Sequence, residues 1–188
     1  MSFETGEPET VKQLSEALTT LVAQGSMFLA PMPDARFFAP QGTAWSPAEH
    51  VRHLRKSSAP LVTALKIPQF LLRMRFGSHP GPSRSFAQIR DMYRGDLAAG
   101  AKAGRFTPEP EAEPANASDR RREIMNAWTA VTVELTGVVA GWSEPALDRH
   151  QLPHPILGRL TVREMLAFTV YHTAHHLRRI EERAAGGA

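Results

Sequence analysis

The chain has 188 residues, of which 42% are hydrophobic and 22% charged, a composition that indicates a globular protein and excludes a disordered or fibrous one. Lys and Arg number 22 against 19 Asp and Glu, so the net charge of +3 gives little reason to expect nucleic-acid binding. Because the chain has no cysteine, it cannot use disulfides, thiolate metal ligands or a cysteine nucleophile, and any reacting thiol must come from a substrate.

The first segment, residues 1–13, is polar and acidic, which is typical of neither a secretory signal nor a membrane anchor. No apolar run approaches the ~18 residues needed to cross a bilayer. We therefore expect a cytoplasmic protein without a membrane partner. The length favours a single domain over residues 1–188.

Helical periodicity predicts a first helix over residues 9–27 and, after a long Pro-containing link over 28–45, a second helix over 47–66. Ser46 and Glu49 form a capping box at the start of the second helix, where Pro47 occupies the first helical position. Pro60 should kink this helix, because proline cannot donate a backbone hydrogen bond.

A long crossover follows over residues 67–118, and it contains a short amphipathic helix that begins at the capping pair Ser85 and Gln88. After this helix comes the Pro- and Glu-rich stretch FTPEPEAEPANAS. The crossover is a candidate lid, with a plain surface connection as the alternative. Its arginines either bind an acidic cosubstrate or form a solvated face; they are Arg73, Arg75, Arg84, Arg90 and Arg94.

A third helix is predicted over residues 119–141 and a fourth over 162–184, the latter starting at the capping box of Thr161 and Glu164. No convincing strand alternation appears anywhere. The sequence therefore predicts an all-α fold, a four-helix bundle with unequal connections.

The last helix contains the stretch YHTAHHLRRI, which holds three of the eight histidines. His172 and His176 are four residues apart, so they lie one above the other on the face that also carries apolar residues. His175 lies at the border of that face and is a bystander or an outer neighbour of the site. Two histidines at this spacing are a weak metal signal by themselves, because the pattern also arises on solvated faces.

A third ligand would come from another segment, and the candidates are His50, His53, His79, His150 and His154. The last three lie in turn-like or irregular contexts, where histidines are usually solvated or cap a turn. Periodicity slightly favours His50 over His53 on the apolar stripe of the second helix but does not settle the choice. Either residue meets the pair if the second and fourth helices run antiparallel side by side.

Three stretches together resemble the DinB-like superfamily of four-helix metalloenzymes: WSPAEHVRHL from Trp45, HPILGRLTVREML from His154, and YHTAHHLRRI from Tyr171. In that family a tryptophan is followed eight residues later by a metal-binding histidine, and H-x-x-x-H stands on the last helix. The resemblance implies an up-down-down-up bundle with the ligands His53, His172 and His176.

Three neutral imidazoles leave an open position on a divalent ion, Zn or Ni, at which water or a thiol can be activated. Imidazole also suits Cu and Fe, so the ligands do not choose the metal. Members of the resembled family transfer low-molecular-weight thiols such as mycothiol and bacillithiol. The resemblance therefore implies a thiol S-transferase or a hydrolase acting on a small-molecule substrate, while the catalytic base stays unidentified.

Two other interpretations stay open: a non-catalytic metal-binding or stress-response module of the same fold, and histidines that form bundle contacts without a metal. The family often has Gln where this chain has Arg179. Either the residues that orient the ligands differ from the family pattern, or Arg179 supplies a cation for an anionic substrate. A homodimer is compatible with the resemblance. Trp45, Trp128 and Trp142 are expected to pack in the core or at helix ends and not to serve as stacking platforms for a ligand.

Overall fold

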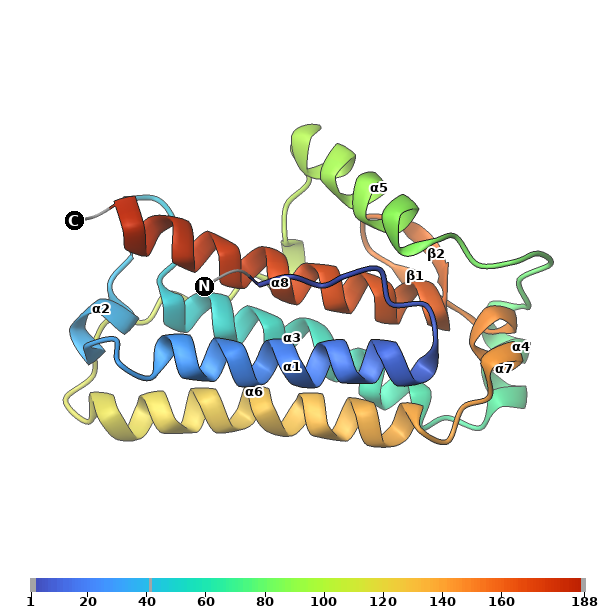
Figure 1. Ribbon diagram of the computed structural model, residues 1–188, viewed down its shortest axis with the longest axis horizontal. Coiled ribbons are helices and arrows are strands. Elements are labelled where there is room, and N and C mark those ends of the chain that lie inside the picture. The colour runs from blue at the N-terminus through green and yellow to red at the C-terminus, as the bar shows by residue number, and fades with distance from the viewer. Residues whose placement is uncertain (1–2, 41, 187–188) are drawn as a thin grey trace.

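Four long helices lie side by side in the computed structural model, which describes residues 3–40 and 42–186 (Figure 1). They are α1 (Val11–Leu29), α3 (Pro47–Leu65), α6 (Ala117–Val139) and α8 (Val162–Gly186). All four correspond closely to the predicted helices. The all-α, four-helix prediction is confirmed.

The direction of the helices follows the up-down-down-up order, because α1 and α8 run one way along the bundle and α3 and α6 run the other (Figure 1). α8 packs against both α1 and α3, and α6 packs against the same two helices. α3 and α8 are therefore antiparallel neighbours, so the first turns of α3 lie beside the second half of α8.

The helix starts confirm the capping signals in the sequence. Ser46 accepts a hydrogen bond from the Glu49 N–H while the Glu49 side chain accepts from the Ser46 N–H, and Ser85 makes the same reciprocal pair with Gln88. Thr161 and Glu164 do so at the start of α8. These caps fix which residues of α3 and α8 face inward.

The connections contain short elements, of which only α5 (Phe86–Ala98) was predicted. The others are α2 (Asp34–Phe38), α4 (Gln69–Phe76), the 3-10 helix η1 (Gly104–Phe106) and α7 (Glu144–Arg149). The absence of strands was predicted wrongly, since β1 (Gln151–His154) and β2 (Gly158–Thr161) form an antiparallel hairpin. Each strand has four residues, too few to show a clear alternation.

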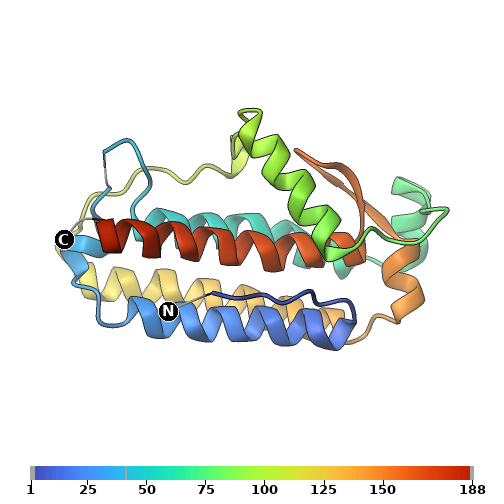
Figure 2. The ribbon, with the colours of Figure 1, turned by 45° about the horizontal axis from the view of Figure 1, so that its top comes forward.

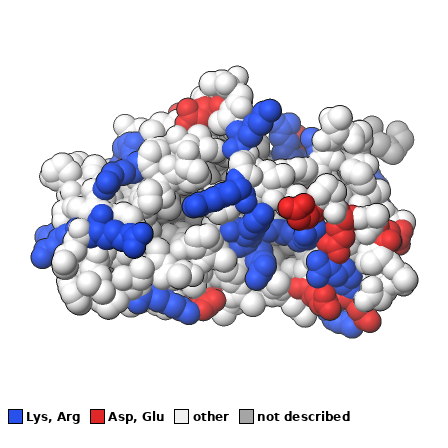
Figure 3. Space-filling model, turned by 180° about the vertical axis from the view of Figure 1, so that it is seen from behind, with Lys and Arg blue, Asp and Glu red and all other residues white. Residues whose placement is uncertain are grey.

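The core runs along the inside of the bundle and receives side chains from all four long helices, among them the fully buried Leu14, Leu54, Trp128 and Leu177. None of the described helices is long and apolar enough to cross a membrane. Seen from behind, the surface has Lys and Arg side chains spread across its middle, with most Asp and Glu towards one end (Figure 3).

One face of the α3–α8 pair is covered by additional elements. α5 crosses over α8, and the β1–β2 hairpin packs against the first half of that helix (Figure 2). η1 packs against α3. Together these elements enclose the space beside the histidine-rich stretch of α8, so the long crossover supplies part of the site.

Candidate metal centre

Three histidine side chains meet between α3 and α8. The Nε2 atom of His172 lies 3.0 Å from Nε2 of His53 and 3.1 Å from Nε2 of His176. One ring nitrogen from each residue falls within 4.8 Å of the other two, and all three side chains are buried. The structure thus brings together the three residues singled out from the family resemblance.

The outer nitrogen of His53 is held by the crossover. Nδ1 of His53 lies 2.9 Å from the Phe106 carbonyl oxygen in η1, and because a carbonyl only accepts, Nδ1 carries the hydrogen. The Nε2 lone pair of the neutral ring is therefore free and points at His172. A histidine that ligates a metal is commonly oriented by such a bond from its other nitrogen.

His50 lies behind the three-histidine cluster and not within it. Its Nδ1 is 2.7 Å from Nδ1 of His176, and the side chain is buried. The mild preference of periodicity for His50 as a ligand does not match this arrangement, because His50 meets the outer edge of the His176 ring. Among the described residues, its Nε2 is buried without a hydrogen-bond partner.

Burial keeps these imidazoles neutral near pH 7. Desolvation, with smaller contributions from neighbouring charges, lowers the pKa of His172 and His176 well below the usual value, and it also lowers that of His53. The same effect lowers the pKa of His50 to about 3. Neutral histidine is the form that binds a metal.

The contact distances fit a bound divalent cation. Nε2 of His172 contacts the Nε2 atoms of both His53 and His176, but a single hydrogen can form a hydrogen bond in only one of these contacts at a time. A cation between the rings would instead bind the lone pairs of all three nitrogens. Tetrahedral ligation with Zn–N bonds of about 2.0–2.1 Å separates ligand nitrogens by roughly 3.3 Å. Small shifts of the rings would therefore accommodate the ion.

Trp45 forms a wall of this cluster. Its ring stacks on His176 at 5.9 Å between centroids and lies 4.9 Å from the His53 ring. The expected packing role holds for the buried Trp128 and Trp142, but Trp45 in addition shields the ligand cluster. Only the antiparallel pairing of α3 with α8 brings the indole to His176.

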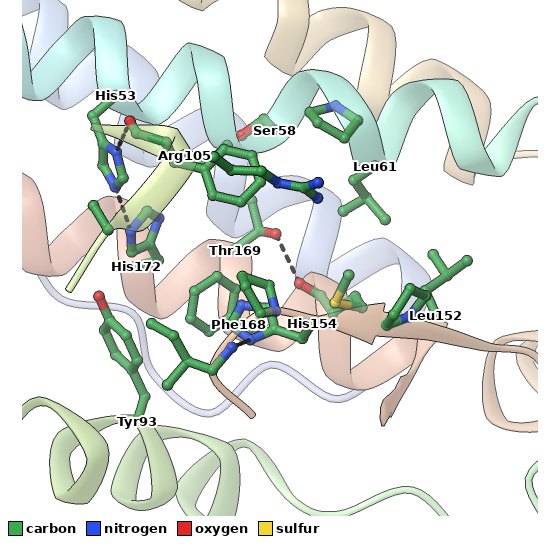
Figure 4. A pocket seen from close by; sticks show the side chains of 18 of the residues that line it. His53, Ser58, Leu61, Tyr93, Arg105, Leu152, His154, Phe168, Thr169 and His172 are labelled. Atoms are coloured by element: carbon green, nitrogen blue, oxygen red, sulfur yellow. Dashed lines mark hydrogen bonds between the residues drawn. The ribbon is translucent and has the colours of Figure 1, made fainter. Parts of the chain in front are cut away.

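A pocket of about 310 Å³ opens beside the cluster, between α3, α8, the hairpin, α5 and η1 (Figure 4). Its walls are mostly apolar, with Leu61, Leu152 and Phe168 among them. The described residues that line it include no Asp or Glu, while Lys102 and Arg105 supply positive charge. A pocket with these walls suits a small molecule.

Two of the remaining histidines, His150 and His154, are more buried than the sequence indicated. His175 lines the pocket beside Tyr93 but lies outside the cluster of three. The expectation of an unsupported side chain was wrong for His150, which is buried at the end of α7 and bonds the Ala146 carbonyl. For His154 the turn-capping alternative is confirmed, because its Nδ1 accepts hydrogen bonds from two backbone N–H groups of the following turn, but the side chain is buried and not solvated. Their tertiary neighbours were invisible in the sequence.

The crossover arginines do not gather at the site. Arg84 pairs with the buried Glu164 and Arg90 pairs with its exposed neighbour Asp91, and none of the five arginines lines the pocket. The pocket cations come instead from Lys102 and Arg105, which the sequence reasoning missed because their segment shows no motif. Arg179 is half exposed and pairs with Glu182 on the same helix.

The comparisons with known proteins agree with this architecture. The sequence model of the DinB superfamily matches residues 13–180. The chain belongs to the DinB superfamily. Among solved structures, this DinB chain is similar to YfiT from Bacillus subtilis, described as a probable metal-dependent hydrolase with an unusual four-helix bundle topology.

The similarity to YfiT covers 96% of the DinB chain and 90% of YfiT, with a TM-score of 0.64 and 16% sequence identity. At this identity the likeness shows a shared fold and not a shared reaction. No match was found among the curated proteins.

Proposed function

We propose that this protein is a metal-dependent enzyme whose divalent ion is held by Nε2 of His53, His172 and His176. The observation that carries the proposal is the convergence of these three buried nitrogens at a pocket large enough for a small substrate. The metal-dependent character described for YfiT supports it.

The bound ion would lower the pKa of a thiol or water and supply a nucleophile near neutral pH. The chain's own residues orient and enclose the site. Phe106 sets the hydrogen position on His53, and Phe168 stacks on the His172 ring at 5.0 Å between centroids. Trp45 excludes solvent from one side of the cluster.

The proposed reaction is transfer of a low-molecular-weight thiol to a small electrophile. A hydrolase usually places a carboxylate near the site to take a proton from water, and the described pocket residues include none. A thiol loses its proton far more readily than water does, so it depends less on such a base. Hydrolysis is the second candidate, because YfiT is described as a hydrolase.

Elemental analysis of the purified protein tests the metal site, after reconstitution with Zn²⁺ and separately with Ni²⁺. We expect about one ion per chain, lost in His53→Ala and in His172→Ala because three-ligand sites bind far more tightly than two-ligand sites. His79→Ala lies outside the cluster and should keep the ion. Absence of metal in the reconstituted wild-type protein would refute the proposal.

Turnover assays separate an enzyme from a binding module. The metal-loaded protein is incubated with electrophiles and a panel of thiols, and in parallel with ester and amide substrates without a thiol. Thiol-dependent product formation that disappears in His176→Ala is the expected result. Metal binding without turnover in either panel would favour a non-catalytic module.

A further inference from the structure

His154 occupies an unusual position at the end of β1. Its Nδ1 accepts hydrogen bonds from two backbone N–H groups of the following turn, Leu157 at 3.0 Å and Ile156 at 3.3 Å. The ring packs edge-on against Phe168 with centroids 4.3 Å apart. The side chain is therefore fixed in place.

These two bonds decide which nitrogen carries the hydrogen. Because Nδ1 accepts, the neutral ring has its hydrogen on Nε2, which is a donor. Burial lowers the pKa of His154 to about 4, so the ring stays neutral at pH 7. No hydrogen-bond partner of Nε2 is found among the described residues. The His154 side chain lines the pocket, and its Nε2 is not among the fully buried atoms, so the nitrogen is accessible from the pocket.

The electrostatic character of the pocket adds a second observation. Its ionisable lining includes Lys102, Arg105 and histidines, and no ion pair of either cation is found within the described chain. Figure 4 shows Arg105 on one side of the pocket and His154 on the other. Unpaired positive charge above apolar walls favours an anion with an apolar body.

We propose that the pocket binds a small apolar carboxylate and that His154 is a positioning residue, donating from Nε2–H to a carboxylate oxygen. Arg105 and Lys102 attract the negative charge, while the hydrocarbon portion packs against Leu61, Leu152 and Phe168. This inference rests on the proposed function, because it treats the pocket beside the metal as the substrate site.

Two substitutions separate the binding role of His154 from its structural role. In His154→Asn the side-chain oxygen can still accept the turn N–H groups from near the Nδ1 position, but the distal donor is lost. In His154→Gln the amide can place an N–H near the position of Nε2. The first variant should keep the hairpin and lose binding, and the second should recover part of the binding.

Isothermal titration calorimetry with hexanoate, and with hexanol as the uncharged match, measures the effect in metal-free and zinc-loaded protein. The metal-free form is included because a carboxylate can also ligate an ion. We expect hexanoate to bind more tightly than hexanol, and His154→Asn to weaken hexanoate about tenfold or more in both forms, the usual effect of losing a charge-assisted bond. Hexanol affinity should change little.

The proposal is overturned if hexanoate shows no saturable binding, if hexanol binds equally well, or if folded His154→Asn binds hexanoate like the wild type. Metal content measured on the same samples keeps the two proposals apart. One zinc per chain without hexanoate binding would refute the carboxylate pocket but not the metal site. Hexanoate binding that depends on His154, in a protein that holds no metal, would refute the metal site but not the carboxylate pocket.

Discussion

At the scale of single residues, the histidines differ because each ring nitrogen has a different neighbour. His53 donates to the Phe106 carbonyl, so its inner nitrogen is an acceptor. His176 has His50 at its outer nitrogen, 2.7 Å away. If His176 ligates a metal through Nε2, its Nδ1 carries the hydrogen and donates to His50. His50 then orients a ligand without being one.

We expect His50→Leu to weaken zinc affinity about tenfold to a hundredfold, the usual effect of removing a residue that orients a ligand. Competition with a zinc chelator of known affinity measures this change. His175→Leu is the matched control, since His175 lies next to His176 on α8 but makes no hydrogen bond to the cluster among the described residues. Equal zinc affinities in the two variants would contradict the assigned role of His50.

At the scale of elements, the bundle depends on close packing between helices and on hydrogen bonds between the crossover and α8. α1 approaches its neighbours closely at Gly25, where an added Cβ would lie 2.8 Å from the Trp128 ring and 2.9 Å from the Leu177 side chain. At the start of α8, the fully buried Glu164 accepts hydrogen bonds from Arg84 and from the Thr161 N–H. This carboxylate ties the chain before α5 to the helix that bears the histidines.

Gly25→Ala should lower the free energy of unfolding by about 1–3 kcal/mol, because the methyl group overpacks the contact with α6 and α8. Gly137→Ala provides the comparison, since a Cβ there meets nothing within 4 Å and alanine favours the helix. That variant should gain about 0.5–1 kcal/mol. Urea unfolding followed by circular dichroism measures both, and equal effects would show that the approach at Gly25 is not tight.

Glu164→Gln should destabilise the fold at pH 7 by about 2–3 kcal/mol, because it removes a charge-assisted network from a buried site. Burial alone would raise the pKa of Glu164, but the hydrogen bonds from Arg84 and Thr161 outweigh it, so the pKa is lowered. A lowered pKa contributes stability above the unfolded value of about 4.3, and this stability is lost as the pH falls through the folded value.

The difference in unfolding free energy between wild type and Glu164→Gln should therefore be largest near pH 7 and should decrease as the pH is lowered below about 4. Urea titrations across this range check the trend. Glu123→Gln serves as the control, because Glu123 is exposed and its ion pair with Arg120 contributes within about 1 kcal/mol. A constant gap for Glu164→Gln at all pH values would contradict a lowered pKa for the Glu164 carboxyl group.

At the scale of the whole molecule, the candidate metal site joins two helices that are far apart in the chain. His53 and His172 are separated by 119 positions, and they meet because α3 and α8 are antiparallel neighbours. The crossover and hairpin then close the pocket over this junction. An ion bound there would stabilise the folded state alone, since the unfolded chain does not bring the ligands together.

Saturating Zn²⁺ should accordingly raise the melting temperature of the protein. At a free concentration of about 100 times Kd, binding adds about 2.7 kcal/mol to the unfolding free energy. Differential scanning calorimetry with zinc and with a chelator measures the shift, and His53→Ala should show almost none. A similar shift in that variant would mean that zinc binds elsewhere.

The sequence by itself determined the four helices and their starts, because capping boxes and helical periodicity are interactions between residues three or four apart. It also placed His172 and His176 on one face. The residues alone did not decide between His50 and His53 as the third ligand. They predicted a solvated or turn-capping His154 but not its burial, and they did not point to Lys102 and Arg105 as pocket residues. Only the tertiary structure decided these, because each depends on side chains brought together from distant segments by the packing of α3, α8, η1 and the hairpin.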